Sequence, residues 1–245
     1  MTRLNSQSPS PRVRSQLTVF SYLRHQERLH SKNYAANGED FLHAYVKTTG
    51  IHETYLESHH MKYCVYDIGG DRAERKKWPY ALDNVDCLVF VASLAAYDTY
   101  PGHGYLNDMR DSLTWFESLL NTAICLTTST IVLLFNKADI FREKIKQSPI
   151  SDFWPDYRGC EGDYDAAIKF FTEKFCTMQQ PEDRREIYVY YSDATNTENS
   201  GIILQSIEAL MVSKNDYCYS LGNHGGTSPA DQYNTNPNNL VRFHR

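Results

Sequence analysis

The sequence predicts a doubly wound α/β domain, in which helices cover both faces of a mostly parallel β-sheet. Strand-like and helix-like segments alternate from about residue 52 to about residue 213. Two segments, 85–91 and 130–135, are nearly continuous runs of apolar residues, as is typical of strands buried on both faces of a parallel sheet. Ligands of such sheets bind beyond the carboxyl ends of the strands, so the residues that follow these strands are the first candidates for a site.

Each expected element has its own local signal. A short helix is expected at 18–31, where Phe20, Leu23 and Leu29 have helix-like spacing. The expected strands lie near residues 52–57, 61–67, 85–92, 129–135 and 186–192. The expected helices lie near residues 72–82, 106–121, 163–178 and 198–213.

Composition narrows the function classes. The chain has 245 residues, 41% of them hydrophobic, with a net charge of −5, which fits one globular domain and argues against nucleic-acid binding. The six cysteines are scattered without a C-x-x-C pair, so we expect reduced cytoplasmic thiols rather than disulfides or a zinc site. No apolar run approaches the length of a transmembrane segment.

The segment Asp67-Ile68-Gly69-Gly70 follows an expected strand and opens into a charged helix. Nucleotide switches use an Asp-x-x-Gly motif between a strand and a helix to sense a terminal phosphate. The aspartate reaches the Mg²⁺ shell, and the glycine N–H donates to the γ-phosphate. The motif alone is weak, so its context decides its meaning.

The segment Asn136-Lys137-Ala138-Asp139 follows the second apolar run. The Asp139 carboxylate would accept hydrogen bonds from guanine N1–H and the exocyclic amine, a donor pair that adenine does not present. Lys137 would lie along the base, and Asn136 would tie neighbouring loops together. The alternative is an ordinary turn in which Asp139 caps a helix.

Taken together, these motifs resemble those of heterotrimeric G-protein α subunits, which have the Ras-like GTPase fold. Residues 66–78 are similar to the second switch, D-V-G-G-Q-R-S-E-R-K-K-W, and residues 45–51 to the first switch, R-V-K-T-T-G-I. Residues 192–195 resemble the T-C-A-T loop, whose Ala N–H contacts guanine O6. The landmarks run in family order from about residue 20 to about residue 218.

The resemblance implies a GTP/GDP switch with Mg²⁺, G-protein-coupled receptor signalling and GTPase activity. Thr48 and Asp67 would bind the metal ion. The residues that would contact the nucleotide are Tyr45, Lys47, Thr48, Asp67, Gly69, Gly70, Asp71, Asn136, Lys137, Asp139 and Ala194.

The chain departs from the family at the catalytic positions. Tyr45 stands where the family has an arginine that stabilises transition-state charge, and Asp71 stands where it has a glutamine that orients the attacking water. The 245 residues also contain no G-x-x-x-x-G-K-S/T phosphate loop. We therefore expect no intact catalytic residue and weak or absent GTP hydrolysis.

The departures also affect the expected architecture. The resemblance implies a disordered segment 1–17, a remnant of the family's helical domain at 18–44, a Ras-like domain at 45–218 and a polar extension at 219–245. The first strand, its phosphate loop and most of the helical domain are expected to be missing, as in an N-terminally truncated, divergent member. The strands ending at Asp67 and near Ala92 would then lack a partner between them.

By resemblance, the partners are a βγ dimer, a receptor and effectors. The partner-binding residues would be Arg72, Arg75, Lys76, Trp78 and Asp111. Arg75 would pair with Asp111, and an arginine–carboxylate fork of this kind can be bidentate. The chain would be cytoplasmic or held at the inner face of the plasma membrane by its partners, since it has no lipidation motif. Two alternatives stay open: a non-catalytic pseudo-GTPase interaction module, and a truncated gene product.

Overall fold

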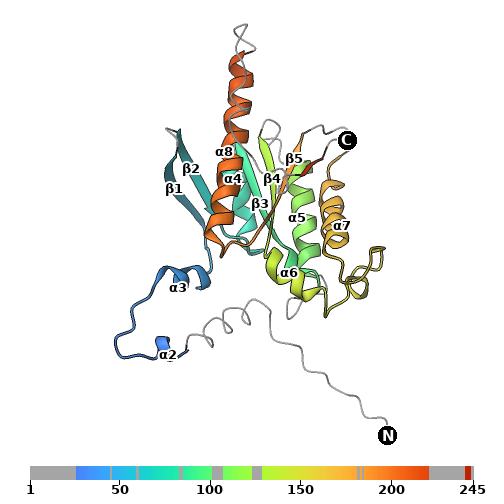
Figure 1. Cartoon of the computed structure of the whole chain (residues 1–245). Helices are drawn as coiled ribbons and strands as arrows, with labels where there is room; N and C mark the ends of the chain where they lie inside the picture. The colour runs from blue at the N-terminus through green and yellow to red at the C-terminus, as the bar shows by residue number, and fades with distance from the viewer. Residues whose placement is uncertain are drawn as a thin grey trace.

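The computed structural model describes residues 26–44, 46–58, 61–82, 85–100, 107–122, 129–180, 183, 185–220 and 241–243. Its strands form two separate sheets (Figure 1). The smaller sheet pairs β1 (Ile51–Ser58) with β2 (Met61–Ile68) in antiparallel fashion. The larger sheet has the order β3 (Cys87–Ser93), β4 (Thr130–Asn136), β5 (Ile187–Ser192) and β6 (Val241–Phe243). β3, β4 and β5 are parallel, as predicted, and β6 runs antiparallel to β5.

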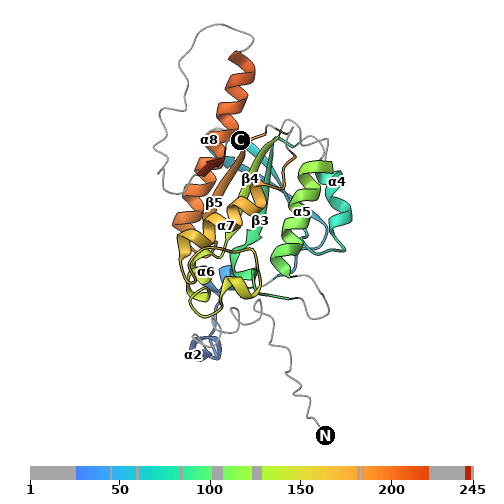
Figure 2. The same cartoon turned by 90° about the vertical axis from the view of Figure 1, so that its right-hand side faces the viewer.

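The helices cover the larger sheet on both faces, which confirms the predicted doubly wound α/β class. Figure 2 shows α5 and α7 on one face and α8 behind the strands. The α-helices are α2 (Gln26–Leu29), α3 (Gly38–His43), α4 (Trp78–Ala81), α5 (Asp108–Thr122), α6 (Ala138–Lys144), α7 (Tyr164–Cys176) and α8 (Thr197–Ser220). Short 3-10 helices are η1 (Arg75–Lys77), η2 (Leu94–Ala96) and η4 (Ile150–Asp152).

The helices differ from expectation in four places. The expected helix 72–82 is a turn followed by η1 and α4, and Pro79 lies near the start of α4, where its missing N–H costs nothing. α8 continues to Ser220, beyond its expected end. α6 was not expected as a helix, nor was α3, where Asn37 and Asp40 form a reciprocal capping box. Of the expected helix 18–31, residues 26–31 are described, and α2 occupies Gln26–Leu29.

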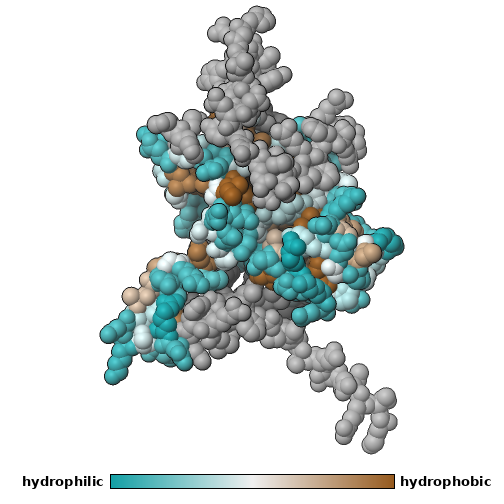
Figure 3. Space-filling view, in the orientation of Figure 1, coloured by the Kyte–Doolittle hydropathy of each residue, from teal (hydrophilic) through white to brown (hydrophobic). Residues whose placement is uncertain are grey.

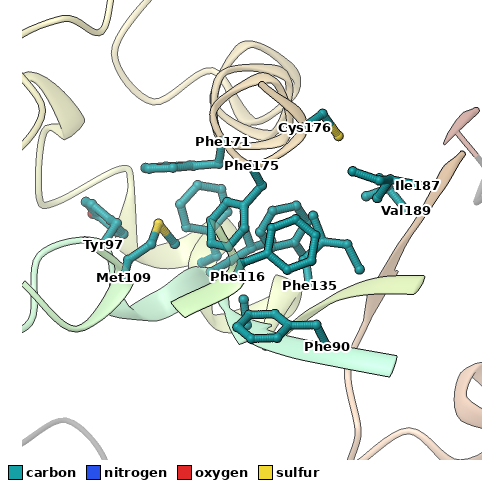
Figure 4. Packing of buried hydrophobic residues seen from close by; sticks show 14 of the residues in the cluster. Phe90, Tyr97, Met109, Phe116, Phe135, Phe171, Phe175, Cys176, Ile187 and Val189 are labelled. Atoms are coloured by element: carbon teal, nitrogen blue, oxygen red, sulfur yellow. The ribbon is translucent and has the colours of Figure 1, made fainter. Parts of the chain in front are cut away.

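The main core lies between the larger sheet and the helices α5 and α7, and it is rich in aromatic rings (Figure 4). Phe135 of β4 meets Phe175 of α7 edge to face, with ring centroids 5.2 Å apart. Phe116 of α5 lies 5.7 Å from Phe175. A second, smaller cluster packs α8 against β4 and β5 through Val132, Tyr188, Tyr190, Ile203 and Ile207. β4 is therefore buried on both faces, as its apolar run predicts.

β3 corrects one expectation, because it is not buried on both faces. Phe90 and Ala92 face the main core, whereas Val89 and Val91 are 40% and 55% exposed on the other face. Cys87, at the start of β3, packs against the α8 cluster, but these two valines lie outside it. Among the described residues, β3 pairs only with β4, and β2 pairs only with β1.

Within the expected polar extension, the residues Val241–Phe243 form β6. Val241 pairs with Val189 and Phe243 with Ile187, which places β6 on the outer edge of β5.

Among the described helices, none is both long enough and apolar enough to cross a membrane. On the face seen in Figure 1, apolar side chains reach the surface between polar ones (Figure 3).

Candidate functional site

The first part of the site lies at the carboxyl ends of β4 and β5, where Asn136 and Ser192 are register partners. The Asn136 Oδ1 atom accepts hydrogen bonds from Lys137 N at 2.8 Å and from Ala194 N at 3.1 Å. It also accepts a bond from Ser192 Oγ at 3.3 Å. One side-chain oxygen thus joins the loop after β4 to the loop after β5.

Lys137 and Asp139 complete the β4 loop. Lys137 has φ 63° and ψ 40°, a left-handed conformation that is uncommon for a residue with a side chain. It is the residue before α6 and makes no side-chain cap. The alternative in which Asp139 caps the helix is therefore wrong. Asp139 lies within the first turn of α6 and is exposed, so its carboxylate is presented to solvent at the end of the sheet.

The second part of the site is the junction between residues 46–50 and the segment after β2. Gly69 N donates to Gly50 O at 3.1 Å, and Thr48 Oγ1 donates to Asp67 Oδ2 at 3.5 Å. A Cβ atom added to Gly69 would lie 2.7 Å from both Thr48 O and Glu74 Cγ. Only glycine fits there, because the backbone of one segment touches the other.

Two carboxylates reinforce this junction. Lys47 Nζ lies 2.5 Å from Asp71 Oδ2. Glu74 Oε2 accepts hydrogen bonds from Gly50 N and from Lys77 Nζ, each at 2.7 Å. The Lys77 ammonium and then the Gly50 N–H lower the pKa of Glu74 below its usual range, so Glu74 remains a charged acceptor at neutral pH.

The third part is the contact between the segment 70–78 and α5. Asp111 Oδ2 accepts from Arg75 Nη2 at 2.6 Å, so the expected pair is present. The other oxygen, Oδ1, accepts from Arg72 Nη2 at 2.9 Å, so the carboxylate is shared by two arginines rather than held in one bidentate fork. The Arg75 guanidinium also lies over the Trp115 ring at 4.6 Å. Trp78 Nε1 donates to Gly69 O at 3.0 Å, which fixes the start of the segment.

Sequence reasoning omitted three residues of the site: Gly50 and Glu74 at the junction, and Trp115 on α5. Glu74 belongs to the motif that drew attention to the segment, yet its bond to Gly50 N joins residues 24 positions apart and has no local signal. Of the predicted residues, Tyr45 lies outside the described residues. Lys76 is exposed, and Gly70 contributes its carbonyl to Arg75 Nε at 3.1 Å.

The residues present fit the groups that the sequence implies. Thr48 and Asp67 bring a hydroxyl and a carboxylate oxygen within 3.5 Å of each other, and Mg²⁺ prefers a few such oxygens together with water and phosphate. Among the described residues, no group of three or more His, Cys, Asp or Glu side chains lies close enough together to hold a metal ion by itself. The two groups expected to read the base lie on neighbouring loops: the exposed Asp139 carboxylate after β4, and the Ala194 N–H, which donates to Asn136 Oδ1, after β5.

Comparison with known proteins agrees with this geometry. A family model described as G-protein alpha subunit matches residues 11–211. The guanine nucleotide-binding protein alpha-2 subunit of Neurospora crassa is 35% identical over 193 residues, which cover 77% of this chain and 53% of that protein. The alpha-1 subunit of Mycosarcoma maydis is 32% identical over 191 residues, with 77% and 53% covered. The chain thus spans about half the length of these curated relatives. This chain belongs to the G-protein alpha subunit family.

Proposed function

We propose that the chain is a guanine-nucleotide-binding signal transducer of the G-protein α type, which takes GDP or GTP with Mg²⁺ and hydrolyses GTP poorly. The observation that supports this most directly is the Asn136 bridge between the loops after β4 and β5. It orders the Ala194 N–H and the turn carrying Asp139, the two groups that would read guanine.

Base recognition would rest on complementary polar groups. The Asp139 carboxylate accepts from N1–H and the exocyclic amine of guanine, and adenine offers no such pair. The Ala194 N–H now donates to Asn136 Oδ1 at 3.1 Å. Guanine O6 would share or take over that hydrogen bond, and Lys137 would lie along the base.

At the phosphate end, Thr48 and Asp67 would hold Mg²⁺, which when bound neutralises charge on the phosphate oxygens. Lys47, Gly69, Gly70 and Asp71 would line the γ-phosphate side. Asp71 pairs with Lys47 at 2.5 Å and, as a carboxylate, brings negative charge to the place where an amide would orient water. This supports slow turnover.

The partner surface would be residues 70–78 together with α5. Arg72, Arg75, Lys76 and Trp78 lie on this segment, which Asp111 anchors. A βγ dimer or an effector would bind there, a receptor would act on nucleotide exchange, and partners would hold the cytoplasmic chain at the membrane. The proposed nucleotide-binding unit is residues 45–218.

A second candidate is the non-catalytic interaction module. The contacts of Asp111 with Arg72 and Arg75 favour it, because they order the partner surface through side chains alone. In this case Arg75→Ala and Trp78→Ala should reduce capture of βγ or an effector in a pull-down. If the parent captures neither with GDP, a GTP analogue or aluminium fluoride, this candidate fails for those partners.

The experiment that tests the first candidate is a titration with fluorescent GDP in Mg²⁺ buffer, competed by unlabelled nucleotides. GTP and GDP should displace the probe, and ATP should not. The single-turnover rate with GTP should stay near the uncatalysed background. Equal displacement by ATP and GTP, or no binding at all, would contradict the proposal.

A further inference from the structure

The two switch segments, residues 46–50 and 69–74, are joined directly to each other through protein atoms. Three contacts make the junction: Lys47 with Asp71 at 2.5 Å, Gly50 N with Glu74 Oε2 at 2.7 Å, and Gly69 N with Gly50 O at 3.1 Å. Two of the three use the charge of a carboxylate. We call Lys47, Gly50, Asp71 and Glu74 the clasp.

We propose that the clasp already holds the two switch segments together before any nucleotide binds, so that the partner surface at residues 70–78 is preformed and bound nucleotide adds little further order to it. This rests on the proposed guanine-nucleotide function. It makes Asp71 and Glu74 positioning residues, since both act through the segments that they join.

Glu74 is the stronger half of the clasp. Its side chain is 16% exposed, and its carboxylate accepts an N–H from the first segment and an ammonium from its own segment. Charge-assisted bonds of this kind are about twice as strong as neutral ones. The close approach at Gly69, where an added Cβ would lie 2.7 Å from Thr48 O, keeps the two backbones within reach.

Asp71 is the weaker, salt-sensitive half. The Lys47 and Asp71 side chains are 54% and 43% exposed, so solvent and salt screen their attraction. The neutral glutamine of the family's second-switch pattern could not form this ion pair. The clasp therefore gains one contact from the same substitution that removes the water-orienting amide.

The clasp residues are connected to the partner surface by neighbouring residues and hydrogen bonds. Glu74 lies directly beside Arg75, which reaches Asp111 Oδ2 at 2.6 Å. Gly69, at the other end, gives its carbonyl to Trp78 Nε1 at 3.0 Å. An ordered junction thus fixes both ends of the segment that would meet a partner.

Hydrogen–deuterium exchange of the full chain, read by mass spectrometry over residues 46–50 and 69–78, tests this. The parent protein should exchange within about twofold of the same rate without nucleotide, with GDP and with a non-hydrolysable GTP analogue. Glu74→Gln should speed exchange in both segments by about tenfold, the loss expected for one charge-assisted hydrogen bond. Asp71→Asn should have a smaller effect that disappears in 1 M salt.

The matched control is Glu57→Gln, the same chemical change at an exposed position on β1, which should leave both segments unchanged. The exchanged pair Lys47→Asp with Asp71→Lys should restore the protection that either single change removes. Parent exchange that slows more than tenfold with the GTP analogue relative to GDP would overturn the proposal, as would an unchanged rate in Glu74→Gln. The nucleotide-free arm tests the clasp even if no nucleotide binds, so its failure is distinguishable from failure of the proposed function.

Discussion

Asp139 is the residue on which base choice depends. The Asp139→Asn variant should bind GDP more weakly and favour xanthosine diphosphate, because an amide donates where the carboxylate accepted and xanthine offers a carbonyl there. Each mismatched hydrogen bond should cost about 1–3 kcal/mol. Competition against a fluorescent guanine nucleotide measures the change, with the exposed Asp152→Asn as control. Unaltered preference for GDP in Asp139→Asn would remove Asp139 from the base-reading site.

Tyr45 and Asp71 are the two residues expected to limit the rate of GTP hydrolysis. An arginine in cis is worth about 10³–10⁵ in rate, as is established for this class of GTPases. Tyr45→Arg combined with Asp71→Gln should still leave a slow enzyme, because these changes supply no phosphate-loop lysine and no serine or threonine ligand for Mg²⁺. Single-turnover hydrolysis measures this. A rate equal to that of intact α subunits would show that the missing contacts do not matter.

The sequence motifs identified some of the site residues and missed others. Asn136 was assigned a loop-tying role from its motif, and its side chain does bridge the two loops. Glu74 was missed as a site residue because its role depends on Gly50, which reaches it only through tertiary folding. A motif identifies groups that act on a ligand, whereas contacts between motifs depend on the packing of both segments.

At the level of elements, the contact between the segment 70–78 and α5 involves two arginines that differ in burial. Arg75 is 11% exposed and lies over Trp115, whereas Arg72 is 61% exposed, yet both bind Asp111. Arg75→Ala should reduce the free energy of unfolding by about 1–3 kcal/mol, because it leaves Asp111 half-paired and uncovers the Trp115 ring.

Arg72→Ala should cost only about 0–1 kcal/mol, the usual value of an exposed ion pair. Urea unfolding of the two variants, followed by tryptophan fluorescence, gives the comparison. Equal shifts of the midpoint would mean that burial against α5 contributes nothing to the Arg75 contact.

Element types were more predictable than element environments. β4 follows from its apolar run, and β5 and α7 lie where a strand and a helix were expected, with the Asp163 side chain capping α7. β3 has the same kind of run as β4, yet Val89 and Val91 are exposed. A local apolar run shows that a strand is suited to burial on both faces. Segments elsewhere in the chain determine whether both faces are in fact covered.

For the whole molecule, the separation of β2 from β3 has the largest energetic consequence. Among the described residues, each of these strands is paired on one side only. Unpaired backbone groups beneath apolar faces cost about 1–3 kcal/mol each when buried, and exposed edges promote aggregation. Val89 and Val91 of β3 stay 40% and 55% exposed, so these apolar side chains add little to a typical stability of about 5–15 kcal/mol.

The chain without nucleotide should therefore be marginally stable and prone to associate through the edges of β2 and β3 that have no partner strand among the described residues. Its thermal midpoint, measured by circular dichroism at several protein concentrations, should lie below about 60 °C. Light scattering on the same samples should increase with concentration. A cooperative transition above that temperature for a monomer would show that the open edges are tolerated.

The most direct test of the central claim, that this chain binds guanine nucleotides through its retained reading groups, is the shift of the thermal midpoint by nucleotide. A ligand that binds only the folded state stabilises it by RT ln(1 + [L]/Kd), about 2.7 kcal/mol at one hundred times the Kd. GDP with Mg²⁺ should raise the midpoint with increasing concentration, and ADP at equal concentration should leave it unchanged. Equal shifts with GDP and ADP, or no shift with GDP up to millimolar concentration, would contradict the account.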